Sequence, residues 1–176
     1  GQNSLSLLVK ILGKGSLTLS KVQPGDQLSL VYPLGKGFTM PLQGEYVLAV
    51  GGGSGIAPLL FLSAKSGLPP DHFTLLMGAR SKSDHISAEE FTAFAGCFFS
   101  TEDGSWGEKG LVTHHSLFND LSRFDRIYSC GPLPMMKAVA REASRQNLFC
   151  EVSLENLMAC GFGVCLCCIE PTVKGN

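Results

Sequence analysis

The hydrophobic pattern of the chain changes near residue 44. Before that point, the Leu- and Val-rich segments 5–12 and 26–32 are bounded by glycine and proline, which is typical of strands in an antiparallel sheet or barrel. The turns between them are predicted at residues 13–16 and 33–37, where glycines recur. After residue 44, short and wholly apolar runs such as residues 46–50 are typical of parallel strands covered on both faces.

From residue 45 to residue 153, predicted strands and helices alternate. Helical periodicity and short apolar runs predict strands over 46–50, 73–77, 96–100, 126–129 and 149–153, and helices over 56–66, 88–95, 111–121 and 132–146. This alternation indicates right-handed crossovers and a Rossmann-like parallel α/β sheet. The predicted organisation is α/β plus β, with a partial antiparallel β-barrel over 1–43, a Rossmann-like domain over 44–153 and a cysteine loop over 154–176.

Composition and charge narrow the class of protein. Hydrophobic residues make up 44% of the 176 residues and charged residues 16%, which is too apolar for a disordered chain. The 14 basic and 15 acidic residues give a net charge of −1, so the chain has no basic excess for nucleic acid. The sequence shows neither a membrane-spanning run nor a signal peptide. We therefore expect a folded, cytoplasmic protein.

A glycine-rich stretch follows the first predicted parallel strand and leads into a helix. It consists of Gly51, Gly52, Gly53, Ser54 and Gly55. Backbone N–H groups at such a helix start can face a phosphate, and glycines let the phosphate come close. The spacing is not G-x-G-x-x-G, because Ile56 stands where the third glycine would be. A tight turn is the simpler alternative, but four glycines in five residues exceed what a turn requires, so the pattern favours a nucleotide site.

A second small-residue turn follows the predicted strand 126–129. It consists of Cys130, Gly131 and Pro132. Open α/β sheets bind ligands at the carboxyl ends of their strands, and these small residues would let a flat ring approach. Taken alone, the stretch is equally compatible with a simple turn.

The chain has seven cysteines, and four of them lie within residues 160–168. Cys160, Cys165 and Cys168 match the plant-type ferredoxin spacing C-x4-C-x2-C for a 2Fe–2S cluster. Cys167 lies between two predicted ligands, so we expect its side chain to point away. Zinc is an alternative, although the second ligand pair that structural zinc prefers is missing. A redox-sensing group of thiols is a third interpretation.

Five other residues receive simpler interpretations. Cys97 and Cys150 sit in apolar runs and are predicted to be small buried side chains. His114 and His115 precede an apolar stretch and are predicted to lie on the surface or to cap a helix. Arg80 follows the second parallel strand, where it either pairs with a nucleotide phosphate or ribose or is solvated.

Six segments together resemble the ferredoxin–NADP reductase superfamily and, within it, the electron-transfer subunits of class 1B dihydroorotate dehydrogenase. The segments are VKILGKGSLTLS, PLGKGF, VGGGSGIAPLLFL, TEDGSWGEKGLVT, YSCGPLPMMKAV and LENLMACGFGVCLCC. They span nearly the whole chain in family order. The resemblance implies a flavin-binding barrel, an NAD-binding domain and a 2Fe–2S loop. It also implies electron transfer in pyrimidine biosynthesis, from an FMN-containing catalytic subunit through the 2Fe–2S cluster and FAD to NAD.

The resemblance also assigns residues to cofactors. FAD would be lined by Leu8, Val9 and Lys10, and its pyrophosphate would meet Gly15 and Ser16. The nicotinamide nucleotide would face Gly51, Gly52, Gly53, Gly55, Cys130, Gly131 and Pro132, and iron would be ligated by Cys160, Cys165 and Cys168. The resemblance implies a dihydroorotate dehydrogenase catalytic subunit as partner, in a heterotetramer, with no side chain needed as nucleophile or general base.

Two family features are expected outside the printed sequence. The Arg-Pro-x-Ser flavin motif is expected before Gly1, and a fourth cluster cysteine is expected within roughly twenty residues after Asn176. The chain as printed is then expected to hold FAD weakly and no complete cluster. Two alternatives stay open: an electron-transfer subunit of another reductase, of hydrogenase or ferredoxin–NADP type, and a regulatory module that binds a nucleotide or metal without flavin.

Overall fold

The computed structural model describes residues 4–32, 34–85, 96–154, 156 and 158–170. The chain divides into two compact units. The terminal unit combines Gly1–Gly37 with Asn156–Asn176, and the sheet unit comprises Phe38–Glu155. The predicted cysteine loop therefore shares a compact unit with the N-terminal segment.

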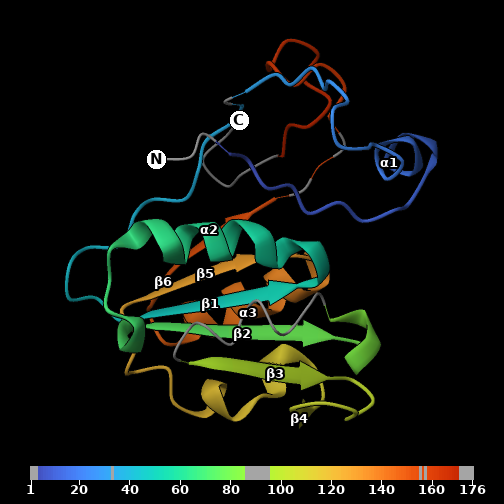
Figure 1. The fold of residues 1–176 in the computed structure, drawn as a ribbon. Helices are drawn as coiled ribbons and strands as arrows, with labels where there is room; N and C mark the ends of the chain where they lie inside the picture. The colour runs from blue at the N-terminus through green and yellow to red at the C-terminus, as the bar shows by residue number, and fades with distance from the viewer. Residues whose placement is uncertain (1–3, 33, 86–95, 155, 157, 171–176) are drawn as a thin grey trace. The chain divides into compact units, whose positions relative to one another are not determined.

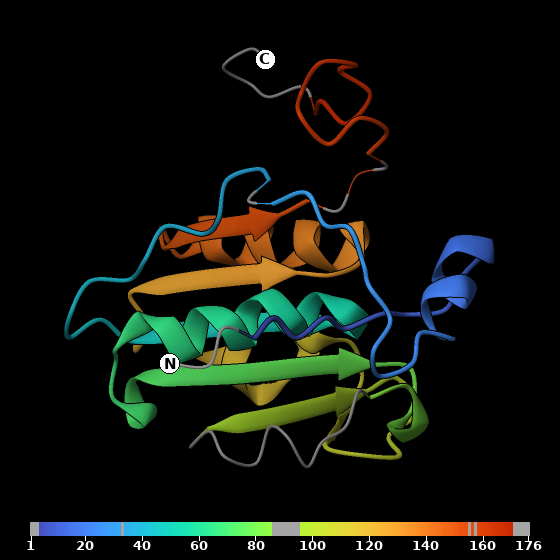
Figure 2. The same cartoon turned by 45° about the horizontal axis from the view of Figure 1, so that its top comes forward.

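A parallel sheet forms the centre of the sheet unit (Figure 1). Within the described residues it has six strands in the order β4-β3-β2-β1-β5-β6. The strands are β1 (Val47–Gly52), β2 (Phe73–Ala79), β3 (Cys97–Thr101), β4 (Glu108–Lys109), β5 (Arg126–Cys130) and β6 (Phe149–Ser153). All neighbours pair in parallel, and the arrows of β2, β3, β5 and β6 point the same way in Figure 2. The predicted Rossmann-like sheet is confirmed, and β4 is an addition to it.

Helices cover both faces of the sheet. α2 (Ile56–Ser66) lies in front of the sheet in Figure 1, and α3 (Leu133–Arg145) lies behind it. α2 ends at Gly67, whose left-handed φ of 67° is the usual way to stop a helix. α3 follows Pro132, which suits a helix start because proline lacks an N–H. No helix in the described part of the chain has the length and apolar character that a membrane crossing requires.

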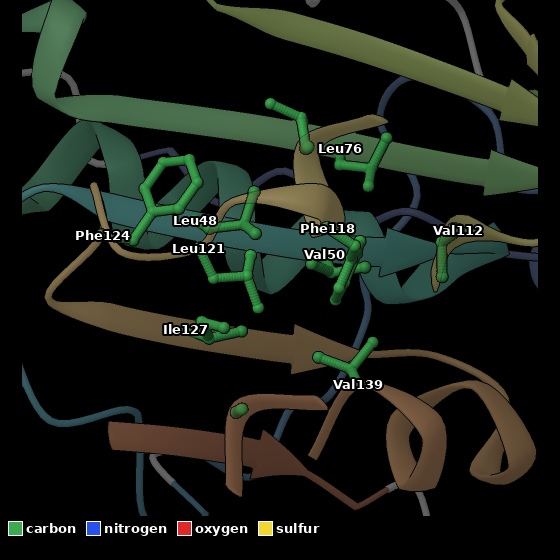
Figure 3. Packing of buried hydrophobic residues seen from close by; sticks show 11 residues of the cluster. Leu48, Val50, Leu76, Val112, Phe118, Leu121, Phe124, Ile127 and Val139 are labelled. Atoms are coloured by element: carbon green, nitrogen blue, oxygen red, sulfur yellow. The ribbon is translucent and has the colours of Figure 1, made fainter. Parts of the chain in front are cut away.

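The core consists of two hydrophobic clusters, one on each face of the sheet. Val47 and Ala49 of β1 pack with α2, while Leu48 and Val50 pack on the opposite face, as the alternation of strand side chains requires. Figure 3 shows the second cluster, where Val139 of α3 joins side chains from the segment before β5. Because both faces are covered, the strands read as continuous apolar runs.

The prediction of a helix over 111–121 is wrong. The segment instead forms two short 3-10 helices, η5 (Val112–His114) and η6 (Ser116–Asn119). His115 between them has an extended backbone (φ −63°, ψ 143°), and its Nδ1 accepts the N–H of Leu117 at 3.1 Å. His115 is buried and caps η6, so the capping alternative holds for it. The predicted helix 88–95 lies outside the described residues.

The other 3-10 helices among the described residues are short and lie at turns of the sheet unit. They are η1 (Gly53–Gly55), η2 (Pro70–His72) and η3 (Lys82–Asp84).

The strands predicted over 5–12 and 26–32 do not form, since none of the described residues 4–32 lies in a strand. The predicted turn at 13–16 instead begins α1 (Lys14–Leu19). The apolar side chains of segments 5–12 and 26–32 are exposed: the exposed fraction is 62% for Leu5 and 50% for Leu28. A barrel strand needs a neighbouring ladder and a covered face, and the described residues supply neither to these segments. The partial barrel is therefore not confirmed.

Candidate functional site

The order of the strands creates a switch point beside β1. The chain runs from β1 outward through β2, β3 and β4, and then returns to pair β5 with the other side of β1. In open α/β sheets, ligands bind beyond the carboxyl ends of the strands at such a point. The glycine turn (residues 51–55) ends β1, and the Cys-Gly-Pro turn (residues 130–132) ends β5. Gly51 pairs with Cys130, so the structure brings together two turns that lie about 80 residues apart in the sequence.

The two turns touch backbone to backbone, and this contact explains several of their glycines. A Cβ placed on Gly55 would lie 2.4 Å from the carbonyl oxygen of Cys130. A Cβ on Gly131 would lie 3.0 Å from the backbone N and O of Gly52. Gly52 in turn has Met135 Sδ 2.9 Å from its Cβ position. Most of the glycine excess is therefore required by close packing.

Only part of the predicted nucleotide site is open to a ligand. Gly53 is exposed, adopts a left-handed φ of +56°, and has no atom within 4 Å of its Cβ position. Ser54 is half-buried and Pro132 is exposed. The other predicted nucleotide residues are buried: Gly51, Gly52, Gly55, Cys130 and Gly131. A ligand at this edge would therefore meet Gly53, Ser54 and Pro132, while the buried residues hold the two turns together.

Cys130 contributes to this edge through its backbone. Its side chain is 1% exposed and belongs to the hydrophobic cluster under α2. The small thiol predicted to let a flat ring approach is therefore packed in the core. Cys130 meets the partner turn through its carbonyl oxygen, which lies 2.4 Å from the Cβ position of Gly55.

Two buried hydroxyls near the carboxyl ends of the strands were not predicted from the sequence. Ser129 in β5 and Ser100 in β3 are almost fully buried, and within the described residues neither Oγ has a hydrogen-bond partner. Buried hydroxyls of this kind are satisfied by ordered water or by a ligand. The signal was present as a serine inside each apolar strand, Arg126–Cys130 and Cys97–Thr101.

Neighbouring positions along the same edge are ordered by side-chain hydrogen bonds. Thr101 is buried at the end of β3, where its Oγ1 donates to Trp106 O at 2.8 Å and accepts Trp106 N–H at 3.0 Å. Arg80, at the end of β2, is exposed. This exposed position is compatible with a pairing to a nucleotide phosphate or ribose and also with a solvated side chain.

The cysteine loop turns through left-handed glycines. Gly161 and Gly163 have φ values of 76° and 78°, and the N–H of Cys165 points to Cys160 Sγ at 3.4 Å. A backbone N–H directed at sulfur in this way stabilises the negative charge of a thiolate. Asn156 Nδ2 donates to Cys168 O at 3.0 Å, which anchors the end of the loop.

The loop supplies ligands suitable for iron but does not gather them. Cys160 and Cys168 are half-buried and Cys165 is exposed. Across the described residues, no three His, Cys, Asp or Glu side chains are grouped so that they could hold a metal ion. The donor set therefore fits a 2Fe–2S cluster in its chemistry, while the three sulfurs would have to converge.

The thiols differ in their tendency to ionise. Hydrogen bonds, first from the backbone N–H of Cys167 and then from Cys160, lower the pKa of Cys165 to about 6. The expectation that Cys167 points away is wrong, because its Sγ lies 3.4 Å from Cys165 Sγ. Burial raises the pKa of Cys97, and it raises that of Cys150 to about 11. Both pack against the core but are half-buried, so the predicted burial is only partial.

The residues assigned to FAD lie in one stretch of the terminal unit. Leu8, Val9 and Lys10 are exposed, with 42% exposure for Leu8 and 39% for Val9. Gly15 and Ser16 lie in the first turn of α1. The Ser16 hydroxyl accepts the N–H groups of residues 12 and 13 at 2.9 and 3.1 Å, so in this structure it serves the start of α1.

The chain is similar to known oxidoreductases. Residues 49–141 match the family model described as the oxidoreductase NAD-binding domain. Over 95% of its length, the chain is 39% identical to "Dihydroorotate dehydrogenase B (NAD(+)), electron transfer subunit" of Caldanaerobacter subterraneus. It is 33% identical over 99% of its length to the protein of that name from Shouchella clausii. The chain spans 65% of the length of the first relative and 67% of the second.

A solved structure gives a similar result. It is described as an NADH-dependent reduced ferredoxin–NADP oxidoreductase that performs flavin-based electron bifurcation. The match has a TM-score of 0.71 and 34% identity, and it covers 91% of this chain and 58% of the other.

Proposed function

Because the chain belongs to the oxidoreductase NAD-binding family and, within it, to the electron transfer subunits of dihydroorotate dehydrogenase B, we propose that it passes electrons from dihydroorotate oxidation to NAD in pyrimidine biosynthesis. One structural observation carries the proposal: two small-residue turns meet at the switch point of a parallel sheet. The cofactors perform the redox chemistry, and the chain binds and orients them.

NAD binds across the carboxyl ends of β1 and β5 in this proposal. The N–H groups of the exposed Gly53 and the half-buried Ser54, just before α2, face the pyrophosphate, because a helix start favours an anion. The backbone contact between Gly55 and Cys130 fixes the distance between the two turns. Pro132 is exposed beside them and offers an apolar surface to the nucleotide.

FAD binds in the terminal unit, at Leu8, Val9, Lys10, Gly15 and Ser16. The exposed side chains of Leu8 and Val9 supply apolar surface for a flavin ring. When bound, the flavin exchanges a hydride with NAD and single electrons with an iron–sulfur cluster.

A 2Fe–2S cluster is held by Cys160, Cys165 and Cys168, with one further thiolate that plant-type spacing calls for. The support is the spacing, the N–H of Cys165 directed at Cys160 Sγ, and the lowered pKa of Cys165, which favours the thiolate that iron requires. When bound, the cluster carries one electron at a time.

The partner is an FMN-containing dihydroorotate dehydrogenase catalytic subunit, in a cytoplasmic heterotetramer. Large apolar side chains of the cysteine loop are exposed and provide a surface for it: Met158 (66%), Phe162 (67%), Val164 (78%) and Leu166 (60%). Exposed apolar patches of this kind mark interaction surfaces.

The proposal is tested on the protein isolated anaerobically from its host. We expect visible absorption of flavin and of a 2Fe–2S cluster, and dihydroorotate-dependent reduction of NAD once the catalytic subunit is added. A colourless protein that contains zinc would contradict the proposal and favour a regulatory module.

A second candidate is an electron-transfer subunit of ferredoxin–NADP type. The 34% identity and TM-score of 0.71 to the ferredoxin–NADP oxidoreductase favour it specifically. The same preparation discriminates the two candidates, since this one reduces ferredoxin with pyridine nucleotide and gives no NAD reduction from dihydroorotate.

A further inference from the structure

We propose that Cys165 and Cys167 form a reversible intramolecular disulfide, which makes the cysteine loop a site of redox modification. The two sulfurs lie 3.4 Å apart and both side chains are exposed. A disulfide has an S–S distance of about 2.05 Å, so small side-chain rotations close the remaining gap.

The backbone between the two cysteines favours this bond. Leu166 has a φ of 57°, a left-handed conformation that non-glycine residues seldom adopt. A fully extended spacer would separate the flanking Cα atoms by about 7 Å, which is at the limit for a disulfide. A left-handed spacer shortens this separation, so the strained residue lies where the bond needs it.

The neighbouring cysteines are less suitable partners. Cys160 and Cys168 are half-buried, whereas Cys165 and Cys167 are exposed. Cys160 Sγ already accepts the N–H of Cys165, and the carbonyl of Cys168 is held by Asn156. An oxidant that reaches the loop from solvent therefore meets Cys165 and Cys167 first.

A low-molecular-weight disulfide such as oxidised glutathione serves as the oxidant. The thiolate of one cysteine attacks it, forms a mixed disulfide and releases one glutathione. The second cysteine then attacks the protein sulfur of that bond, and the second glutathione leaves. The two protein thiols lose two protons and two electrons in total, and the oxidant takes them up as two glutathione thiols.

The consequence for the loop rests on the proposed function. Cys165 cannot ligate iron while it is bonded to Cys167. The oxidised loop therefore does not bind a 2Fe–2S cluster, and reduction of the disulfide restores binding.

The test uses the full chain, reduced and then equilibrated in glutathione buffers of rising oxidised fraction. Peptide mass spectrometry is expected to find a Cys165–Cys167 bond and a fall from seven thiols to five. Cys167→Ser is expected to lower the yield of intramolecular disulfide in the loop by about tenfold or more, because it removes the preorganised partner. Cys168→Ser, the matched control, is expected to leave the bond in place.

Two outcomes would overturn the proposal: a bond between Cys160 and Cys165 or Cys168 in the wild-type chain, or undiminished disulfide formation in Cys167→Ser. Iron–sulfur reconstitution is measured separately, on reduced and oxidised protein isolated from its host, because the printed chain is expected to lack the fourth cluster ligand. If the reduced chain takes up no cluster while the disulfide forms, the proposed cluster fails and the modification site stands. If both chains take up the cluster equally, the inferred competition at Cys165 is wrong.

Discussion

Leucine has opposite surroundings in the two units. Leu48 in β1 of the sheet unit is fully buried, whereas Leu12 in the terminal unit is 81% exposed. Both lie in Leu- and Val-rich segments that the sequence predicts as strands. Leu48 has a strand on each side and a covered face, while residues 4–32 have no strand ladder. The difference teaches that an apolar run becomes a strand only where the fold supplies partners for its backbone.

The exposed side chains also suggest a division of labour. The sheet unit uses its apolar residues for its own core, and its candidate site is backbone at one edge. In the proposed function, the terminal unit uses its apolar residues for a flavin, and for a partner through Phe162 and Val164.

Truncation of the buried leucine gives the largest expected effect. Leu48→Ala should lower the free energy of unfolding by about 3–4 kcal/mol, because it leaves a cavity between the sheet and the side chains packed on that face. Leu12→Ala, the matched change in the terminal unit, should stay within about 0.5 kcal/mol. Urea unfolding followed by circular dichroism measures both. Equal losses would contradict the contrast between the units.

Substitution by alanine distinguishes a glycine that is required by close packing from one that has open space around it. Gly55→Ala should cost about 3 kcal/mol and weaken NADH binding, because the new Cβ meets the backbone of Cys130 at 2.4 Å. Gly53→Ala has open space and only the cost of its left-handed φ, about 1 kcal/mol. Unfolding curves and NADH fluorescence titration check both variants. A Gly53 variant as unstable as the Gly55 variant would show that the turns are not held by that contact.

Acid should weaken the sheet unit through Glu45. Burial raises the pKa of Glu45, but hydrogen bonds from Arg126 and from the N–H of Leu42 more than offset this and leave it below its ordinary 4.5. Because the unfolded chain then takes up the proton first, this stabilisation is present above pH 4.5 and is lost as the pH falls through the lowered pKa.

Glu45→Gln should therefore cost about 1 kcal/mol at pH 7 and flatten the decline of stability with acid. Urea unfolding between neutral pH and pH 3 measures this, with the exposed Asp71→Asn as control. If the free energy of unfolding of Glu45→Gln fell with acid as steeply as that of the wild type, the ion pair would not be the cause of the acid sensitivity.

The sequence predicts most of the sheet unit and less of the terminal unit, for a physical reason. The predicted strand 149–153 and helix 56–66 coincide with β6 and α2, because short apolar runs and helical periodicity leave strong local patterns. Whether 5–12 and 26–32 form strands could not be predicted from their local sequence, since strand formation there depends on partners far away in the chain. The extended backbone of His115, which divides a predicted helix, depends likewise on surrounding tertiary structure.

The candidate site was predictable in composition but not in arrangement. The glycines of residues 51–55 were identified, yet their packing against Cys130 appears only when β1 and β5 pair. The spacing of Cys160, Cys165 and Cys168 could be recognised in the sequence. The approach of Cys167 to Cys165 could not, because it depends on the left-handed backbone of Leu166.

The most direct test of the account locates the nucleotide on the chain. The ¹⁵N-labelled protein is titrated with NADH while backbone amide shifts are followed. The account predicts saturable shifts that are largest at Gly53, Ser54 and Gly131, which directly precedes the exposed Pro132, and small at the amino ends of β1 and β5. Binding that leaves these three amides unmoved, or shifts concentrated at the opposite edge of the sheet, would contradict it.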